Sequence, residues 1–246
     1  MKVKTILISQ PEPKVENSPY AELEAKLKVK IDFIPFIHIE GVDTKEVRQQ
    51  KIDLKNFSAI ILTSRNAVDN FFRIAEEMRY EVPDSLKYFC QSEAVAFYLQ
   101  KYVVYRKRKI YVAKRTFQDL VDILKKHKTE KFLFPSSDVL KPTVPKKLDK
   151  LGINWSRAIL YRTVVSDLSH LKDVTYDVLV FFSPSGIKSL FENFPDFEQK
   201  NTKIAVFGNT TIKAARDNGL KVNIKVPTPE TPSMTMALEK YIKENK

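Results

Sequence analysis

Two segments of the chain are near-copies of one another, and this repeat limits the folds that the chain can adopt. The first is Ile60–Phe72 (IILTSRNAVDNFF) and the second is Val180–Phe191 (VFFSPSGIKSLF). In each, a short apolar run ends in a serine, Ser64 or Ser183, and apolar residues then recur at the i, i+3, i+4, i+7 spacing of an amphipathic helix. The pattern predicts a buried strand that leads into a helix through a serine-bearing turn, twice in one chain.

A second pair of matching segments indicates the same division. Tyr88–Glu93 (YFCQSE) follows the first copy at nearly the spacing at which Val206–Thr211 (VFGNTT) follows the second. We interpret the chain as two related lobes that offer strand-to-helix turns to a shared cleft. Hydroxyls and free backbone N–H groups at such turns attract anions, because they lie at the positive end of a helix dipole.

Apolar runs and helical patterns alternate along the remaining chain, which predicts parallel sheets covered by helices on both faces. The predicted strands are Lys4–Ser9, Ala59–Thr63, Lys87–Cys90, Ile110–Ala113, Lys131–Phe134, Val178–Phe182, Lys203–Phe207 and Val222–Val226.

Two longer extended segments, Ile31–Ile39 and Asn154–Ser166, can pair as a two-stranded antiparallel ribbon that leaves one lobe and returns to it. The first strand and helix are too few for a lobe of their own, so we expect them to complete the C-terminal lobe. The predicted fold is therefore α/β, with two similar lobes joined by the ribbon. The predicted parts are a discontinuous lobe of residues 1–33 and 166–246, an inserted lobe of residues 40–154, and a ribbon of residues 34–39 and 155–165.

The composition is that of an ordinary soluble globular protein, with 43% hydrophobic and 29% charged residues. No apolar stretch approaches the roughly 18–20 residues of a membrane span, so we expect no membrane association. The single cysteine, Cys90, excludes an internal disulfide and fits a reducing compartment. We expect a cytoplasmic protein.

The net charge of +12 favours anionic partners, whether nucleic acid, an anionic membrane, a polycarboxylate or a phosphate, and composition alone does not choose among them. The densest basic run is Arg106–Lys109, with Tyr102 and Tyr105 beside it, and a nucleic-acid patch is one interpretation of it. We favour the other interpretation, a solvated strand edge protected by charge.

Several common chemistries have no support in the sequence. The chain has five glycines and neither of the standard glycine-rich nucleotide loops. The three histidines, His38, His127 and His170, are far apart in the chain, and no cysteine or carboxylate cluster accompanies them at metal-ligand spacing. A serine nucleophile with a histidine base is therefore disfavoured.

Hydroxyl side chains instead follow many of the predicted strands. In open parallel sheets, ligands bind beyond the carboxyl ends of the strands. Many hydroxyls, a basic background and no strong acid–base pair describe a site that holds a large polyanion. These hydroxyls belong to Ser64, Ser92, Ser136, Ser137, Ser183, Ser185, Thr210, Thr211 and Thr228.

The order of five motifs resembles that of the uroporphyrinogen-III synthase family. The motifs are ILTSRNAVDNFF, LGINWSRAILYRTV, LVFFSPSGIKSLF, KIAVFGNTTIKAARDNGL and VPTPETPSMTMAL. The resemblance implies a monomeric, two-lobed lyase of porphyrin and heme biosynthesis that needs no cofactor. It implies closure of hydroxymethylbilane to uroporphyrinogen III, with loss of water and inversion of ring D. A candidate partner is the enzyme that precedes this step.

The reaction that the resemblance implies explains the basic charge, because the substrate carries eight carboxylates. Loss of its hydroxyl as water leaves an azafulvene cation, which the substituted carbon of the terminal ring must attack. The unsubstituted carbon gives the symmetrical isomer without help, so the enzyme must control conformation and supply one proton donor.

The resemblance also assigns site residues by their place in the motifs. Tyr161 is the candidate proton donor, and the alternative is a strand tyrosine packed at the hinge. Lys203 and Thr210 match a K-x-x-x-x-G-x-T motif. The candidate substrate-binding residues are Ser64, Arg65, Asn66, Ser92, Ser136, Ser183, Ser185, Gly186, Lys203, Asn209, Thr210, Thr211 and Thr228.

One turn departs from the family pattern. Cys90-Gln91-Ser92-Glu93 stands where the family usually has G-x-x-T, and Glu93 adds a negative charge there. A non-catalytic tetrapyrrole or polyanion binder is therefore the alternative function, and a nucleic-acid binder that uses Arg106–Lys109 is a weaker one.

Overall fold

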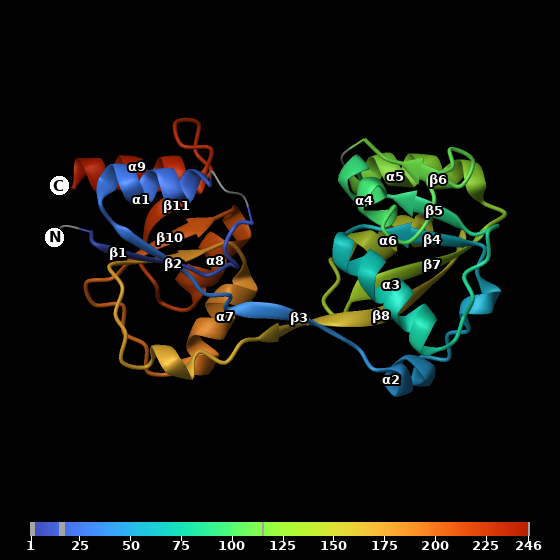
Figure 1. Ribbon diagram of the computed structural model, residues 1–246, viewed down its shortest axis with the longest axis horizontal. Helices are drawn as coiled ribbons and strands as arrows, with labels where there is room; N and C mark the ends of the chain where they lie inside the picture. The colour runs from blue at the N-terminus through green and yellow to red at the C-terminus, as the bar shows by residue number, and fades with distance from the viewer. Residues whose placement is uncertain (1–2, 15–17, 115, 246) are drawn as a thin grey trace. The chain divides into compact units, whose positions relative to one another are not determined.

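The computed structural model describes residues 3–14, 18–114 and 116–245. The chain forms two compact units (Figure 1). Unit 1 comprises Met1–His38 with Val164–Lys246, and unit 2 comprises Ile39–Thr163. We describe each unit by itself.

Unit 1 is a five-stranded parallel sheet with two helices on each face. The strand order is β11-β10-β9-β1-β2. Helices α1 and α9 pack on one face, and α7 and α8 pack on the other. The elements are β1 (Thr5–Ile8), α1 (Pro19–Leu27), β2 (Lys30–Phe33), η3 (Ser169–Leu171), β9 (Val178–Phe181), α7 (Pro184–Asn193), β10 (Lys203–Phe207), α8 (Asn209–Asp217), β11 (Val222–Val226) and α9 (Met234–Glu244).

Unit 2 holds a six-stranded sheet in the order β3-β8-β7-β4-β5-β6. Helices α2, α3 and α4 share a core with one face, and α5 and α6 share a core with the other. The elements are β3 (Ile37–Gly41), α2 (Thr44–Gln49), η1 (Leu54–Asn56), β4 (Ala59–Leu62), α3 (Arg65–Glu77), β5 (Lys87–Cys90), α4 (Glu93–Leu99), β6 (Ile110–Val112), α5 (Phe117–Leu124), η2 (Lys125–His127), β7 (Lys131–Ser137), α6 (Thr143–Lys150) and β8 (Asn154–Val165).

Apart from β3, the two sheets have the same strand order if the strands of unit 1 are numbered from β9 and continue from β11 to β1. Strands β4, β5, β6, β7 and β8 of unit 2 then correspond to β9, β10, β11, β1 and β2 of unit 1. The repeated sequence segments are the corresponding pairs β4–α3 and β9–α7. The predicted α/β fold of two similar parallel sheets flanked by helices is confirmed.

Serine caps fix the start of the helix in both copies of the repeat. Ser64 Oγ accepts a hydrogen bond from the N–H of Ala67 (3.1 Å), and Ser183 Oγ accepts one from Gly186 (3.2 Å). Such caps satisfy a donor that the first helical turn leaves free. The strands before them are buried on both faces, which explains why their sequences are continuously apolar.

Two segments differ from the sequence-based interpretation. Ile31–Ile39 divides at Pro35 into β2 and β3, which belong to different sheets. Strand β7 does not end at Phe134 but continues through Ser137, because its partner β8 stays paired with it, across a register shift between Ser136 and Ser137. The short helix α2 has no counterpart among the predicted elements.

Strands β3 and β8 carry the chain between the units. The N–H of Val42 donates to the carbonyl of Leu160 (2.9 Å), and the N–H of Ser166 donates to Phe36 (3.0 Å). The paired residue numbers run in opposite directions, as in an antiparallel pair. Residues 154–161 of β8, most of which the sequence assigned to the ribbon, also pair with β7 in the six-stranded sheet.

None of the helices in the described part of the chain is long and apolar enough to cross a membrane.

Candidate functional site

A pocket in unit 2 opens where the direction of the strand order reverses. From β4 the chain proceeds to β5 and β6 on one side, and from β7 to β8 on the other. This is the switch point at which open α/β sheets place their ligands. The pocket encloses about 360 Å³ beyond the ends of β4 and β7. Its polar lining residues are Thr63, Ser64, Gln91, Ser136, Ser137, Lys141, Thr143, Lys147 and Tyr161.

Tyr161 and Ser64 form the centre of this pocket. The Tyr161 hydroxyl and Ser64 Oγ share a hydrogen bond of 3.3 Å, and only 7% of Tyr161 is exposed. Burial raises the pKa of Tyr161 above its ordinary value, and hydrogen bonds from Ser64 and from the backbone of Ser137 partly oppose this rise. The phenol is therefore protonated at neutral pH, while both neighbours can stabilise a phenolate that forms transiently.

Arg157 on β8 holds the wall of the pocket that Ser136 and Ser137 form. Its Nε donates to Ser136 Oγ (2.8 Å), and its Nη2 donates to the carbonyls of Ser137 (2.6 Å) and Asp138 (2.7 Å). The N–H of Asp138 donates to the carbonyl of Tyr161 (3.1 Å). The wall is thus tied to the strand that carries the candidate proton donor.

The pocket has a positive lining. Lys141 precedes α6 and Lys147 lies on it, and none of the described lining residues is acidic. Lys147 Nζ donates to Gln118 Oε1 (2.8 Å), so its charge is not neutralised by that bond. Cations beside hydroxyl donors suit a carboxylate ligand.

The structure brings together only part of the predicted set in unit 2. Ser64, Ser136 and Tyr161 line the pocket. Ser92 caps α4 through the N–H of Val95 (3.4 Å), and it is the preceding residue, Gln91, that lines the pocket.

Arg65 and Asn66 do not line this pocket. Both are at the start of α3, and the Arg65 guanidinium lies over the Tyr98 ring, 5.4 Å from its centroid. The sequence interpretation named Gln91 only as a member of the Cys90–Glu93 turn and did not single out Lys147. Gln91 directly follows β5, and Lys147 lies on the helix after β7. The sequence indicates both positions, but only the order of the strands in the sheet shows that they lie near Tyr161.

In unit 1 the equivalent switch point lies between β9 and β1. Ser183 caps α7 there, and Ser185 and Gly186 follow in the first turn. A Cβ on Gly186 would stand 3.7 Å from Ser9 Oγ, so this turn lies against the residue that follows β1. These predicted residues share one edge of the sheet.

Helix α8 begins at the same edge without a side-chain cap. Gly208, with φ of 86°, precedes it, and Asn209 and Thr210 are at its start while Thr211 is buried. Thr228 belongs to the loop after β11, where its Oγ1 accepts from the N–H of Thr231 (3.0 Å).

Lys203 and Thr210, two of the predicted substrate-binding residues, stand at opposite ends of β10 in unit 1. Lys203 is the first residue of β10 and pairs with Val178, the first residue of β9. Thr210 follows the other end of β10. A strand rises about 3.3 Å per residue, so the two residues lie at opposite edges of the sheet.

Within the described residues, no group of three or more His, Cys, Asp or Glu side chains is placed to hold a metal ion.

The fold and the pocket define a class: α/β proteins of two units with parallel sheets, whose hydroxyl and amide groups gather at the carboxyl ends of the strands. The model of the family described as uroporphyrinogen-III synthase HemD matches residues 18–236. The chain therefore belongs to the uroporphyrinogen-III synthase family.

One curated relative and two solved structures show how similar the chain is to individual proteins. The chain is 28% identical over 137 residues to a curated uroporphyrinogen-III synthase of Saccharomyces cerevisiae, a match that covers 50% of this chain and 50% of that relative. Among solved structures, uroporphyrinogen-III synthetase from Helicobacter pylori has a TM-score of 0.63 at 18% identity, with 98% of this chain and 99% of that one covered. A mutant uroporphyrinogen III synthase from the extremely thermophilic bacterium Thermus thermophilus has a TM-score of 0.57 at 16% identity, with 99% and 100% covered. These two structures support the fold.

Proposed function

We propose that the protein closes hydroxymethylbilane to uroporphyrinogen III. The observation that carries the proposal is the Tyr161 hydroxyl, which is hydrogen-bonded to Ser64 on a buried tyrosine in a basic switch-point pocket of a chain in this family. A buried hydroxyl beside cations and further hydroxyls supports the proposal, because the reaction requires a proton donor and groups that bind carboxylates.

In the proposed mechanism Tyr161 gives its phenolic proton to the hydroxyl of the substrate. The C–O bond breaks, water leaves, and an azafulvene cation remains beside a phenolate that Ser64 and the Ser137 N–H stabilise. The substituted carbon of the terminal ring attacks the cation and gives the spiro intermediate. The bond from this carbon to its original methylene bridge then breaks and leaves a second azafulvene cation, which the unsubstituted carbon of the same ring attacks, so that ring D is inverted. The proton lost when the last pyrrole becomes aromatic again restores the phenol.

The pocket binds only part of the substrate. Its volume of about 360 Å³ is small for a tetrapyrrole with eight carboxylates, so we assign it the reacting end, with Lys141 and Lys147 as carboxylate partners. In unit 1 the proposed carboxylate-binding groups are those at the starts of α7 and α8: Ser183, Ser185, Asn209 and Thr210.

An isomer assay tests the proposal. The purified protein is incubated with hydroxymethylbilane, the products are oxidised, and isomers III and I are separated by chromatography. We expect mainly isomer III, and a Tyr161→Phe variant that yields mainly isomer I. Isomer I at the uncatalysed ratio from the unaltered protein would contradict the proposal.

The same assay separates the alternative function. A non-catalytic tetrapyrrole binder, suggested by the Cys90–Glu93 turn, would bind the product and leave the isomer ratio unchanged.

Since hydroxymethylbilane closes to isomer I without help, direct transfer from the enzyme that produces it would be advantageous. We propose that enzyme as a transient partner, which co-sedimentation with and without substrate would test.

A further inference from the structure

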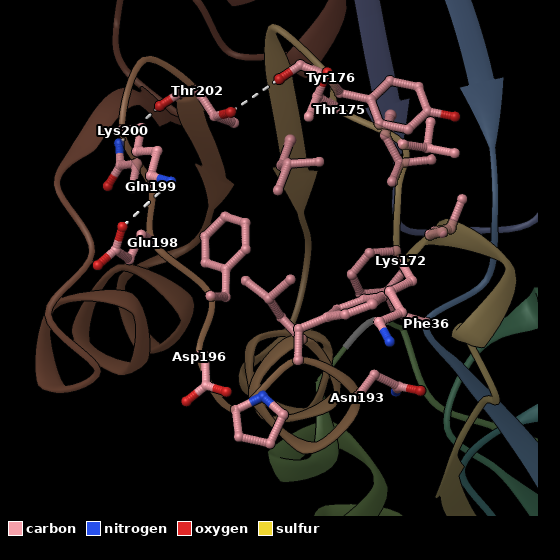
Figure 2. A pocket seen from close by; sticks show the side chains of 18 of the residues that line it. Phe36, Lys172, Thr175, Tyr176, Asn193, Asp196, Glu198, Gln199, Lys200 and Thr202 are labelled. Atoms are coloured by element: carbon pink, nitrogen blue, oxygen red, sulfur yellow. Dashed lines mark hydrogen bonds and ion pairs between the residues drawn. The ribbon is translucent and has the colours of Figure 1, made fainter.

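A larger pocket lies in unit 1, away from every residue used above for the reaction (Figure 2). It encloses about 770 Å³, which is within the range of small-molecule sites. The segment before β9 and the loop before β10 form its walls, so it lies at the amino ends of these strands. The hydroxyls of Ser183 and Thr210 lie at the carboxyl ends, at the other edge of the sheet.

The floor of this pocket is apolar. Leu7 of β1, Leu179 of β9 and Leu190 of α7 are almost fully buried, and Phe36 is 1% exposed beside them. Phe194 and Phe197 add two further rings to the lining. Aromatic and aliphatic side chains around a concave space favour a flat, apolar ligand body.

The described lining carries three acidic side chains, Asp177, Asp196 and Glu198, of which only Glu198 is paired with a cation. Asp177 accepts from the N–H groups of Lys4 (2.7 Å) and Thr5 (3.0 Å), and Glu198 pairs with Lys200 at 3.4 Å. Asp196 is exposed, and Figure 2 shows it across the hollow from Lys172.

Lys172 is the cation of the pocket that has no acidic partner. In the described part of the chain, no carboxylate lies within ion-pair distance of its Nζ. Figure 2 shows Lys172 and Asn193 on one side of the hollow, and Glu198, Gln199 and Lys200 on the other. A ligand whose negative group meets Lys172 would place its apolar body over Phe36, Leu179 and Leu190.

We propose that this pocket is a second binding site, which takes a small aromatic anion such as an aromatic carboxylate or sulfonate. The site is separate from the Tyr161 pocket and does not depend on the proposed synthase activity.

The test uses two fluorescent probes on the whole protein. Anilinonaphthalene sulfonate carries the negative group, and phenylnaphthylamine has the same aromatic frame without it. We expect both probes to bind saturably at one site per chain. Replacing Lys172 by Gln should weaken the sulfonate about three- to tenfold, as expected for one charged partner near the surface, and leave the neutral probe unchanged. Asp196→Asn is the matched control and should not weaken either probe.

Two blocking variants locate the site. Thr175→Trp fills the mouth of the unit 1 pocket from an exposed position, and Val139→Trp does the same for the Tyr161 pocket, where Val139 is 77% exposed. Binding lost with Thr175→Trp and kept with Val139→Trp supports the proposal. The reverse result, or no saturable binding by the unaltered protein, overturns it. Thermal melting of each variant shows that the fold is kept.

Discussion

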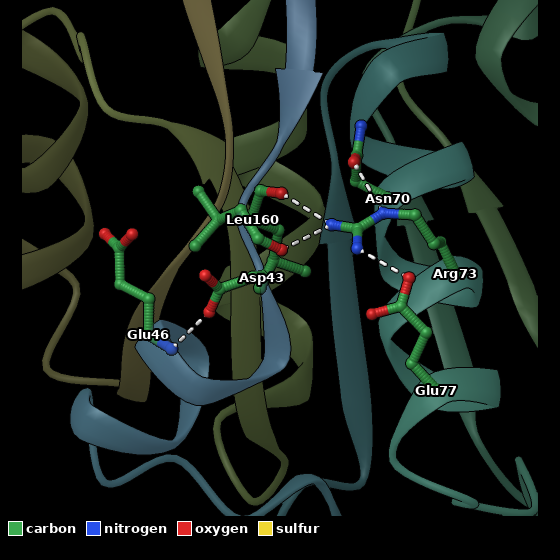
Figure 3. A network of polar contacts seen from close by, with 7 residues as sticks. Asp43, Glu46, Asn70, Arg73, Glu77 and Leu160 are labelled. Atoms are coloured by element: carbon green, nitrogen blue, oxygen red, sulfur yellow. Dashed lines mark hydrogen bonds and ion pairs between the residues drawn. The ribbon is translucent and has the colours of Figure 1, made fainter.

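The guanidinium of Arg73 occupies the space that a Cβ on Gly41 would need. An ideal Cβ at residue 41 would stand 2.6 Å from Arg73 Cζ and Nη2. Figure 3 shows the reason for this close approach: Arg73 Nη2 donates to the carbonyls of Val42 (2.8 Å) and Leu160 (3.1 Å). Its other nitrogens bind Asn70 and Glu77. Arg73 thereby fastens the end of β3 and the middle of β8 to α3.

Replacing Gly41 by Ala should lower the free energy of unfolding by about 1–3 kcal/mol, since the guanidinium must leave at least one carbonyl. Urea unfolding measures the change. Arg73→Ala should be similarly destabilising, and the double variant should cost less than the sum of the two, because the two changes disrupt the same contact. Additive effects would show that the contact is not shared. Lys213→Ala, which removes an exposed ion pair with Asp217, is a control expected to change stability by less than about 0.5 kcal/mol.

Tyr161→Phe should lower kcat for isomer III formation by about a hundredfold or more, as expected for loss of a general acid. Tyr111→Phe is the matched control, because its hydroxyl donates to the carbonyl of Arg108 (3.1 Å) away from the pocket. Equal rates for the two variants would remove Tyr161 from the mechanism.

The pH dependence of kcat should follow from the raised pKa of Tyr161. A group whose pKa rises on folding keeps its proton to higher pH, so the acid form persists through neutral pH. We therefore expect that ionisation of Tyr161 does not lower kcat below about pH 10, the ordinary pKa of a tyrosine. A decline near pH 8 that Tyr161→Phe abolishes would contradict this.

Arg157→Ala should reduce isomer III formation by about tenfold, because Ser136 and the Ser137 and Asp138 carbonyls lose a charged donor that shapes the pocket. Arg162→Ala on the same strand removes only the exposed pair with Glu46 and should leave the rate nearly unchanged. Initial rates at several substrate concentrations test this, and equal losses in both variants would argue for a general effect on β8.

Cys90 should not react with thiol reagents in the folded protein. It is 0% exposed, and burial raises its pKa to about 12. Above the unfolded-state pKa of about 8.5, the thiol ionises in the unfolded protein but stays protonated in the folded protein. The free energy of unfolding is therefore unaffected by this group below about pH 8.5 and falls as the pH rises above that value. Labelling by a chromogenic disulfide at pH 8 should therefore proceed only as the protein unfolds in urea. Fast labelling without denaturant would contradict the burial.

The elements and their caps follow closely from local sequence, whereas the site does so only in part. Ser64 and Ser183 mark helix starts because a cap acts within three residues. The motif that contains Lys203 and Thr210 does not by itself reveal that β10 separates the two residues end to end.

Long-range partners explain what the sequence could not predict. Gln91 and Lys147 join Tyr161 only through the order of β4, β5 and β7 in the sheet. The sequence did not single out Arg157, since its partners lie some 20 residues away, on β7 and directly after it.

Because β3 pairs with β8, the two points at which the chain enters and leaves unit 2 lie side by side, so unit 2 can be removed from the chain as a whole. Where the chain enters it, Val42 is bonded to Leu160, and where the chain re-enters the other half, Phe36 is bonded to Ser166. The cut ends on either side are therefore neighbours, so a tight loop of a few residues would join residue 38 to residue 164 and make unit 1 continuous, whereas residues 39–163 are already one continuous segment. A gene encoding residues 39–163 alone, and a second gene that splices residue 38 to residue 164 through such a loop, should each yield a protein that folds by itself.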